Sequence, residues 1–176
     1  MTKQQIIQLL QEKHNAFIAY IQTLSAEEFL YAPTDKWTAA QQLDHIYRSV
    51  KPLAQALGYP KFIPRLLFGK ANRPSKTYEQ LINRYNEKLS LGGRASGRFV
   101  PAAISASQKN GLIKLILVWV NKLSKRIEKF SETDLDKLIL PHPLLGKITI
   151  REMLYFTAYH AAHHEAIIKR DLKNKN

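Results

Sequence analysis

The chain of 176 residues contains no cysteine. This absence excludes disulfide bonds, thiolate metal ligands and a cysteine nucleophile, and it fits a reducing compartment. Long hydrophobic runs are also missing: the longest, residues 115–120, is much shorter than the ~20 residues that a membrane-spanning helix needs. Residues 1–24 mix polar and charged side chains with apolar ones, a pattern that secretory signals do not tolerate. We therefore expect a cytoplasmic protein that does not associate with membranes.

Acidic residues are scarce. The chain has 14 Asp and Glu residues against 27 Lys and Arg residues, which gives a formal net charge of +13. Clustered positive charge attracts phosphates. Here, however, the basic residues are spread over the chain, including residues 61–76, 94–98 and 169–175. We therefore assign the charge mainly to solubility and do not expect a nucleic-acid partner, with polyanion binding as the alternative.

Apolar residues recur at helical spacing in four long segments. Capping boxes, in which Ser or Thr is followed three residues later by Glu or Gln, mark three of their starts at Thr2, Thr38 and Thr149. The predicted long helices cover residues 2–24, 38–57 and about 107–130, and a fourth starts at Thr149 and has inward positions as far as Ile167. Shorter helical segments are predicted at residues 25–28, within 62–68, at 78–89 and at 131–135.

The absence of any useful β-alternating run completes the fold prediction. With a length that suits one well-buried core, residues 1–176 are expected to form a single all-α domain, a four-helix bundle with short accessory helices in the connections. Residues 141–147 are predicted to be a tight connection. Residues 92–98 contain three glycines, but no strand precedes them and no Gly-Lys-Ser/Thr sequence follows, so we predict a flexible loop and not a phosphate cradle. The apolar stripe of the third long helix is expected to comprise Leu112, Leu115, Ile116, Trp119, Leu123, Ile127 and Phe130.

Three histidines lie within five residues of the last helix, at His160, His163 and His164. Positions 160 and 164 are one helical turn apart, so both rings can bind one metal ion. They also continue an apolar seam that includes Met153 and Ile167. Buried imidazoles need polar partners, and a metal ion is a partner that satisfies both rings. The alternative is a solvated, histidine-rich helix face.

A third ligand is harder to place. His45 is the obvious candidate, but the apolar stripe through Leu43, Ile46 and Val50 puts it on the opposite side of its helix. A second reading has this helix covered on two sides, with its Thr38, Gln41, His45 and Ser49 face lining a cleft. The pattern leaves both readings open. His14 interrupts the stripe of the first helix, and we expect a partly buried core or cleft histidine with a hydrogen-bonding partner there, not a ligand.

Three segments together carry a family resemblance: residues 37–46 (WTAAQQLDHI), residues 142–149 (HPLLGKIT) and residues 155–164 (YFTAYHAAHH). In this combination the chain resembles the DinB-like superfamily over residues 35–168. Members of that superfamily are four-helix bundles named for DNA-damage inducibility, and many are regarded as metal-dependent enzymes. The middle of the chain, with its prolines and glycines, is less typical of the superfamily.

The resemblance implies a divalent metal, nickel or zinc above all, held by His45, His160 and His164. It implies no ligand role for His163, which we expect to be exposed or to flank the site. It implies a structural role for His142, bracing the loop that precedes the last helix. A metal with three histidine ligands keeps positions open for water and substrate, which is typical of catalytic sites.

Two reactions on a small molecule follow from the resemblance. One is transfer of a low-molecular-weight thiol, as in the bacillithiol and mycothiol S-transferase branches, and the other is metal-assisted hydrolysis. The alternatives are a non-catalytic stress-response protein that binds polyanions, and a metal that serves stability alone. A homodimer is compatible with the family. The candidates for a general base are His14, Asp44, His163 and Glu165, and nothing in the sequence selects among them.

Overall fold

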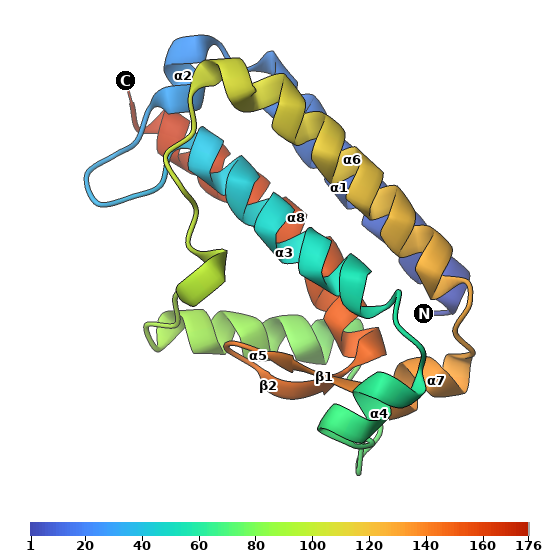
Figure 1. The fold of residues 1–176 in the computed structure, drawn as a ribbon. Coiled ribbons are helices and arrows are strands. Elements are labelled where there is room, and N and C mark those ends of the chain that lie inside the picture. The colour runs from blue at the N-terminus through green and yellow to red at the C-terminus, as the bar shows by residue number, and fades with distance from the viewer. Residues whose placement is uncertain (176) are drawn as a thin grey trace.

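Four long helices form the body of the protein in a computed structural model that describes residues 1–175 (Figure 1). They are α1 (Lys3–Thr23), α3 (Ala39–Ala56), α6 (Lys109–Ile127) and α8 (Ile150–Lys173). Helix α3 packs mainly on α6, and α1 packs mainly on α8. The predicted four-helix bundle is thus confirmed, with helix ends within a few residues of the predicted positions, and α8 continues beyond the last predicted inward position, Ile167, to Lys173.

Capping boxes start the helices where the sequence predicts them. At Thr2, Thr38 and Thr149 the hydroxyl accepts a hydrogen bond from the backbone N–H three residues later, and that residue's side chain accepts one from the capping residue's own N–H. Ser25 does the same for the short helix α2 (Ala26–Leu30). Each box satisfies two N–H groups that a helix otherwise leaves without partners.

The connections contain several shorter elements. Three are helices that cover the end of the bundle where α8 begins: α4 (Phe62–Phe68), α5 (Tyr78–Ser90) and α7 (Glu132–Lys137). Between α5 and α6 the chain forms two 3₁₀ turns, η1 (Gly97–Phe99) and η2 (Ala106–Gln108). Figure 1 shows this stretch passing beside α3 on its way from α5 to α6.

A small antiparallel hairpin, which the sequence analysis does not predict, is added to the all-α fold. Strand β1 (Ile139–His142) pairs with β2 (Gly146–Thr149) in a register that sets Ile139 opposite Thr149. The predicted tight connection at residues 141–147 is therefore the tip of this hairpin, where Gly146 has a φ of 73°, a conformation that glycine adopts without strain. Strands of four residues are too short to show alternation in the sequence.

Glu152 ties this end of the molecule together. Its side chain is fully buried and receives two hydrogen bonds from the Arg73 guanidinium, at 2.7 and 2.9 Å, and one from the Lys76 N–H. Burial by itself raises the pKa of Glu152, but these hydrogen bonds outweigh burial and hold the pKa below its usual value. An ionised Glu152 therefore fixes the segment before α5 against the first turn of α8.

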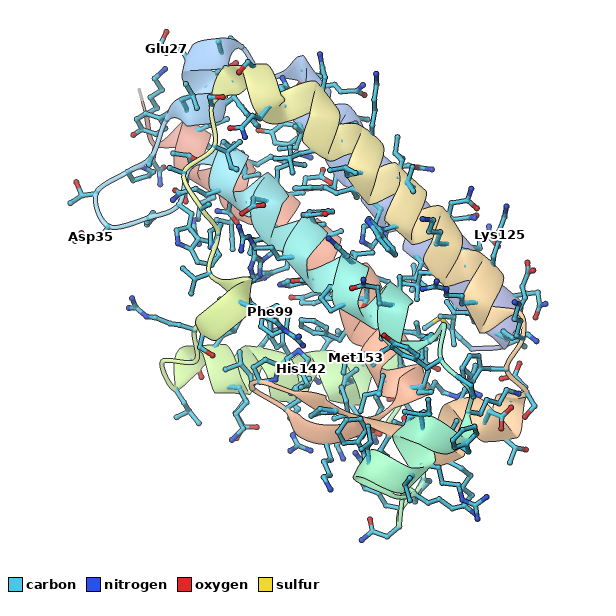
Figure 2. All side chains as sticks on the ribbon, viewed as in Figure 1. Glu27, Asp35, Phe99, Lys125, His142 and Met153 are labelled. Carbon is cyan, nitrogen blue, oxygen red and sulfur yellow. The ribbon has the colours of Figure 1, made fainter. Side chains whose placement is uncertain are left out.

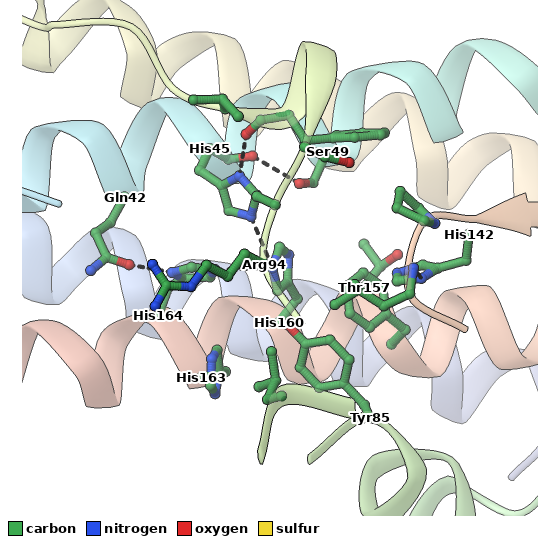
Figure 3. Close-up of a pocket in the computed structure, with 18 of the residues that line it drawn as sticks. Gln42, His45, Ser49, Tyr85, Arg94, His142, Thr157, His160, His163 and His164 are labelled. Carbon is green, nitrogen blue, oxygen red and sulfur yellow. Dashed lines mark hydrogen bonds between the residues drawn. The ribbon is translucent and has the colours of Figure 1, made fainter. Parts of the chain in front are cut away.

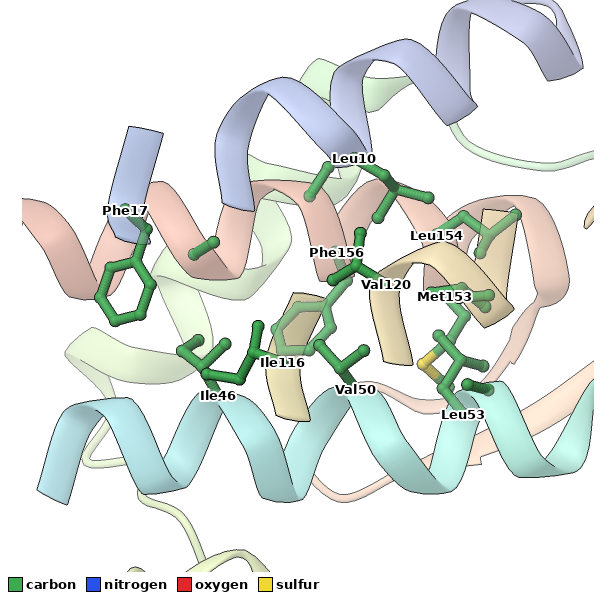
Figure 4. Close-up of a cluster of buried hydrophobic side chains, with 14 of the residues drawn as sticks. Leu10, Phe17, Ile46, Val50, Leu53, Ile116, Val120, Met153, Leu154 and Phe156 are labelled. Carbon is green, nitrogen blue, oxygen red and sulfur yellow. The ribbon is translucent and has the colours of Figure 1, made fainter. Parts of the chain in front are cut away.

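The core lies between the long helices (Figure 4), whereas charged side chains such as Lys125 and Glu27 project from the periphery (Figure 2). The predicted stripe of α6 is partly wrong, because Leu115 is 43% exposed while Ile113 and Val120 are buried. The observed stripe is rotated because α6 packs on both α1 and α3. Among the described residues, no helix is long and apolar enough to span a membrane.

His14 lies in the core with no exposed surface, which confirms the prediction of a core histidine and goes beyond partial burial. Its Nδ1–H donates to the backbone oxygen of Leu10 at 2.7 Å, while Nε2 has no partner. Burial lowers the pKa of His14 to about 4. The ring is therefore neutral in the folded protein at pH values where it is charged in the unfolded chain.

His14→Leu is expected to weaken the dependence of stability on pH. Between the unfolded pKa and the lower folded pKa, the unfolded chain binds a proton that the folded protein rejects, so stability falls as the pH falls. This group accounts for about 2 kcal/mol of lost stability between pH 7 and pH 5. Urea unfolding of parent and variant at both pH values measures it, with the exposed neighbour changed in Asn15→Leu as control. An unchanged pH dependence in His14→Leu would contradict the assignment.

Candidate metal centre

A cavity of about 960 Å³ opens between α3, α5 and α8 (Figure 3). The tip of the hairpin and residues 94–100 complete its wall. The cavity is of the size that small-molecule sites have. His45 from α3 and His160, His163 and His164 from α8 all line it.

The three predicted ligand residues meet in this wall. The Nε2 atom of His160 lies 3.2 Å from Nε2 of His45 and 2.9 Å from Nε2 of His164. All three rings are buried, and each is at most 5% exposed. Their ligand atoms lie close enough together to hold one metal ion, and within residues 1–175 these three histidines are the group for which this is true.

Hydrogen bonds fix which nitrogen carries the proton in two of the three rings, His45 and His164. Nδ1 of His45 lies 2.6 Å from the backbone oxygen of Phe99, and Nδ1 of His164 contacts Oε1 of Gln42. Both oxygens accept hydrogen bonds, so each Nδ1 carries the proton and each Nε2 presents a lone pair. His160 can supply at most one proton to two such neighbours. At least one nitrogen lone pair in the cluster therefore accepts no hydrogen bond. A shared cation would be a partner for the lone pairs of all three rings.

The spacing of the nitrogens fits one ion. Two imidazole nitrogens bound at ~2.1 Å with tetrahedral angles lie about 3.4 Å apart, and a right angle between them gives about 3.0 Å. The two separations from the His160 nitrogen, 2.9 and 3.2 Å, are close to these values, and all three ligand atoms lie within 4.8 Å of one another. The donor set also fits, since imidazole suits zinc, nickel, copper and iron, and no thiolate or carboxylate joins the cluster.

Burial keeps the rings in the form that binds metal. It lowers the pKa of His45, and it lowers the pKa of His160 and His164 well below the ordinary value, with the neighbouring rings adding to the effect. Metal ligands must be neutral imidazoles. The cluster is thus ready to bind a cation at neutral pH without first releasing protons.

The structure decides between the two predicted placements of His45 on its helix. Leu43, Ile46 and Val50 of α3 are buried in the core, while His45 and Ser49 line the cavity on the other side. The two-sided reading is therefore correct, and the expectation from periodicity alone that His45 faces away from the site is wrong. Gln42, not Gln41, is the glutamine on the cavity side.

Residues 93–96 of the glycine-containing segment form a loop without regular structure, as predicted, and the residues that follow, 98–102, are attached to α3. Besides the bond from His45 to Phe99, Arg48 donates to the backbone oxygen of Arg98, and the Ala102 N–H donates to Oδ2 of Asp44 at 3.0 Å. Asp44 itself is held by Arg48. The segment therefore forms part of the cavity wall, and its Phe99 carbonyl holds the His45 ring in place. No motif in the sequence reveals this role.

The remaining candidates separate by position. Of the four general-base candidates only His163 lines the cavity: His14 is in the core, Asp44 is bound to Arg48, and Glu165 pairs with Lys169 at 2.5 Å. His163 is partly exposed, as expected. His142 braces the hairpin, as predicted, since its Nδ1 accepts the N–H groups of two residues at the hairpin tip, both at 3.1 Å.

Aromatic side chains that the sequence analysis did not single out surround the cluster. Trp37 stacks on His164 with ring centroids 6.5 Å apart and packs against His45. Phe156 stacks on His160 at 4.6 Å. The only signal for these residues in the sequence is their placement beside the histidines, in the segments that carry the family resemblance.

Comparison with known proteins agrees with this architecture. The family model of the DinB superfamily matches residues 9–168, so the chain belongs to the DinB superfamily. A solved structure described as TT2238, a four-helix bundle protein, is similar to it with a TM-score of 0.61 and 15% sequence identity, covering 96% of this chain and 99% of the other. At that identity the likeness concerns the fold alone. No curated protein matches the sequence significantly.

Gln42→Leu is expected to weaken binding of a divalent metal by about 10- to 100-fold, because it leaves the Nδ1–H of His164 without an acceptor and frees the ring to rotate. Titration against a competing chelator measures the affinity. Gln55→Leu, the same change at an exposed position of the same helix, is the matched control and should bind metal as the parent does. Equal affinity of Gln42→Leu and the parent would show that Gln42 does not orient a ligand.

Proposed function

We propose that this protein is a divalent-metal-dependent enzyme that acts on a small molecule and that His45, His160 and His164 hold the metal. The observation that supports the proposal is the convergence of three Nε2 atoms in the wall of an open cavity of about 960 Å³. Structural metal sites are closed by four protein ligands, whereas three ligands beside a cavity leave a position for water or substrate.

A divalent ion held by neutral imidazoles supplies a Lewis acid, which makes water or a thiol a better nucleophile near neutral pH. This chemistry serves the two reactions that the family resemblance implies, thiol transfer and hydrolysis. Both need a cavity that admits a small molecule beside the ligands, and this chain provides one.

The chain's own residues orient the ligands and limit access of water. Gln42 and the Phe99 carbonyl hold the rings of His164 and His45 in the orientation that directs Nε2 inward. Trp37 and Phe156 pack against the cluster and reduce its contact with solvent. Removing water from a site strengthens the electrostatic interactions within it.

Elemental analysis of protein purified without a histidine tag tests the metal site. We expect about one nickel or zinc ion per chain after reconstitution. His45→Ala, His160→Ala and His164→Ala should each lose the ion, while His163→Ala, which changes a histidine of the same cavity outside the cluster, should keep it. A parent protein that takes up no metal, or a His160→Ala variant that binds it as tightly, would contradict the proposal.

Assays of thiol transfer and of ester hydrolysis on the same preparations test catalysis. Turnover should require the metal and should be lost in His160→Ala. If metal binds stoichiometrically and chelation destabilises the fold while both activities stay at background over a broad set of small substrates, the ion is structural and the enzymatic part of the proposal is wrong.

A further inference from the structure

The cavity is elongated, and the histidine cluster lies near its middle. Along α8 the lining residues extend from Met153 to Asp171, which corresponds to about 27 Å at 1.5 Å per residue. Helix α3 contributes residues from Gln42 to Ala56 along the same groove. His160 and His164 each lie about 10 Å from one end, because seven residues of helix separate them from Met153 and Asp171 respectively.

One end of the cavity is apolar. It is formed where α8 begins, by Leu53 and Ala56 of α3, Phe68 of α4, Leu140 of β1 and Met153 of α8. Within residues 1–175, α4 and β1 contribute no Asp, Glu, Lys or Arg to the cavity wall, and the His142 side chain of β1 is uncharged at neutral pH because burial lowers its pKa to about 4. A hydrocarbon or aryl group placed here would be removed from water without removing water from a charged side chain.

The other end is basic. Where α8 ends, the wall contains Lys36 and Arg170, and residues 94–100, which pass beside His45 and Arg48 of α3, add Arg94 and Arg98 on the same side of the cavity, next to the histidine cluster. The acidic side chains there are Asp35 and Asp171, so four cations face two anions and the net charge is +2. Lys36 and Arg170 share Asp171, with contacts of 3.1 and 2.9 Å.

Arg94 and Arg98 differ from the other two cations in having no acidic partner. Neither forms an ion pair with any side chain of residues 1–175. The backbone oxygen of Arg98 accepts a hydrogen bond from Arg48 of α3, and the Arg98 guanidinium lies over the Phe99 ring, 5.1 Å from the centroid. Arg94 lines the same wall four residues earlier. In Figure 3 the Arg94 side chain extends across the site in the direction of Gln42 and His164. Two guanidinium groups thus remain available to an anion in the cavity.

We propose that the cavity binds an anionic amphiphile, a small molecule with a negatively charged head near Arg94 and Arg98 and an apolar tail between Leu53 and Met153. This inference rests on the proposed function in one respect, namely that the occupant is the substrate and presents its reacting bond to the histidine cluster between head and tail. Guanidinium groups bind carboxylate, sulfonate and phosphate heads with paired hydrogen bonds. The polarity of the two ends sets the direction in which the molecule lies.

Calorimetric titration of the metal-free protein with octanesulfonate tests the inference apart from the metal, because a sulfonate stays charged at all working pH values and is a poor metal ligand. We expect octanesulfonate to bind at least about tenfold more tightly than 1-octanol, which lacks the charge, and than ethanesulfonate, which lacks the tail. Octyltrimethylammonium, with the opposite charge, should bind more weakly than 1-octanol. Equal binding of the charged and uncharged octyl probes, or of the long and short sulfonates, would overturn the inference.

Substitutions assign the two ends. Arg94→Gln and Arg98→Gln should each weaken octanesulfonate binding by about fivefold or more and leave 1-octanol binding unchanged. Arg65→Gln removes the same charge from an exposed position outside the cavity and should have no effect. Ala56→Phe, which fills the apolar end, should reduce the advantage of octanesulfonate over ethanesulfonate. If Arg65→Gln weakens binding as much as the cavity variants do, the attraction is general and the inference fails.

The outcome is separable from that of the metal proposal. Selective binding of octanesulfonate by a protein that takes up no metal would refute the enzyme proposal and keep the ligand class. Stoichiometric metal with no preference for the anionic octyl probe would refute the ligand class and keep the metal centre.

Discussion

The structure depends on one electrostatic constraint: three imidazole nitrogens from two helices are directed at a common point. The hydrogen bonds of His45 and His164 place their protons on the far side of each ring, so both Nε2 lone pairs face Nε2 of His160, at 3.2 and 2.9 Å, and His160 can donate a proton to at most one of them. Like partial charges at that distance repel, and buried polar atoms without partners are costly. A cation would remove both costs, and the surrounding elements hold the rings in this arrangement.

The cavity forms because only one side of α3 packs against the hydrophobic core. Its apolar side packs on α6 and joins the core, so its other side is free to carry His45 and to form a wall opposite α8. The segment between α5 and α6 then closes part of the opening, and its Phe99 carbonyl supports His45. The same segment therefore shapes the cavity and orients a candidate ligand. A change in it would alter both.

The sequence predicts much of the fold, because helix starts and core stripes are local properties. Capping boxes mark the starts of three long helices at Thr2, Thr38 and Thr149, and each box depends only on two residues three positions apart. The hairpin was missed because strands of four residues carry no alternation, and the α6 stripe was misplaced at Leu115 because its rotation depends on which neighbours it meets.

The site was predictable to a smaller extent. The spacing of His160 and His164 brings them together on any helix, whereas the periodicity of α3 argued against His45, and only the family resemblance placed it with the other two. Gln42, Phe99 and the two cavity arginines of residues 94–98 could not be foreseen, since their roles depend on where a long connection crosses the bundle.

The most direct test of the account is X-ray absorption spectroscopy of the protein loaded with one equivalent of zinc or nickel. The account predicts imidazole scattering from three histidines at about 2.0–2.1 Å, reduced or abolished in His45→Ala, the variant that removes the contribution of α3. A spectrum that shows fewer imidazoles, or one that His45→Ala leaves unchanged, would contradict the claim that the two helices share one ion.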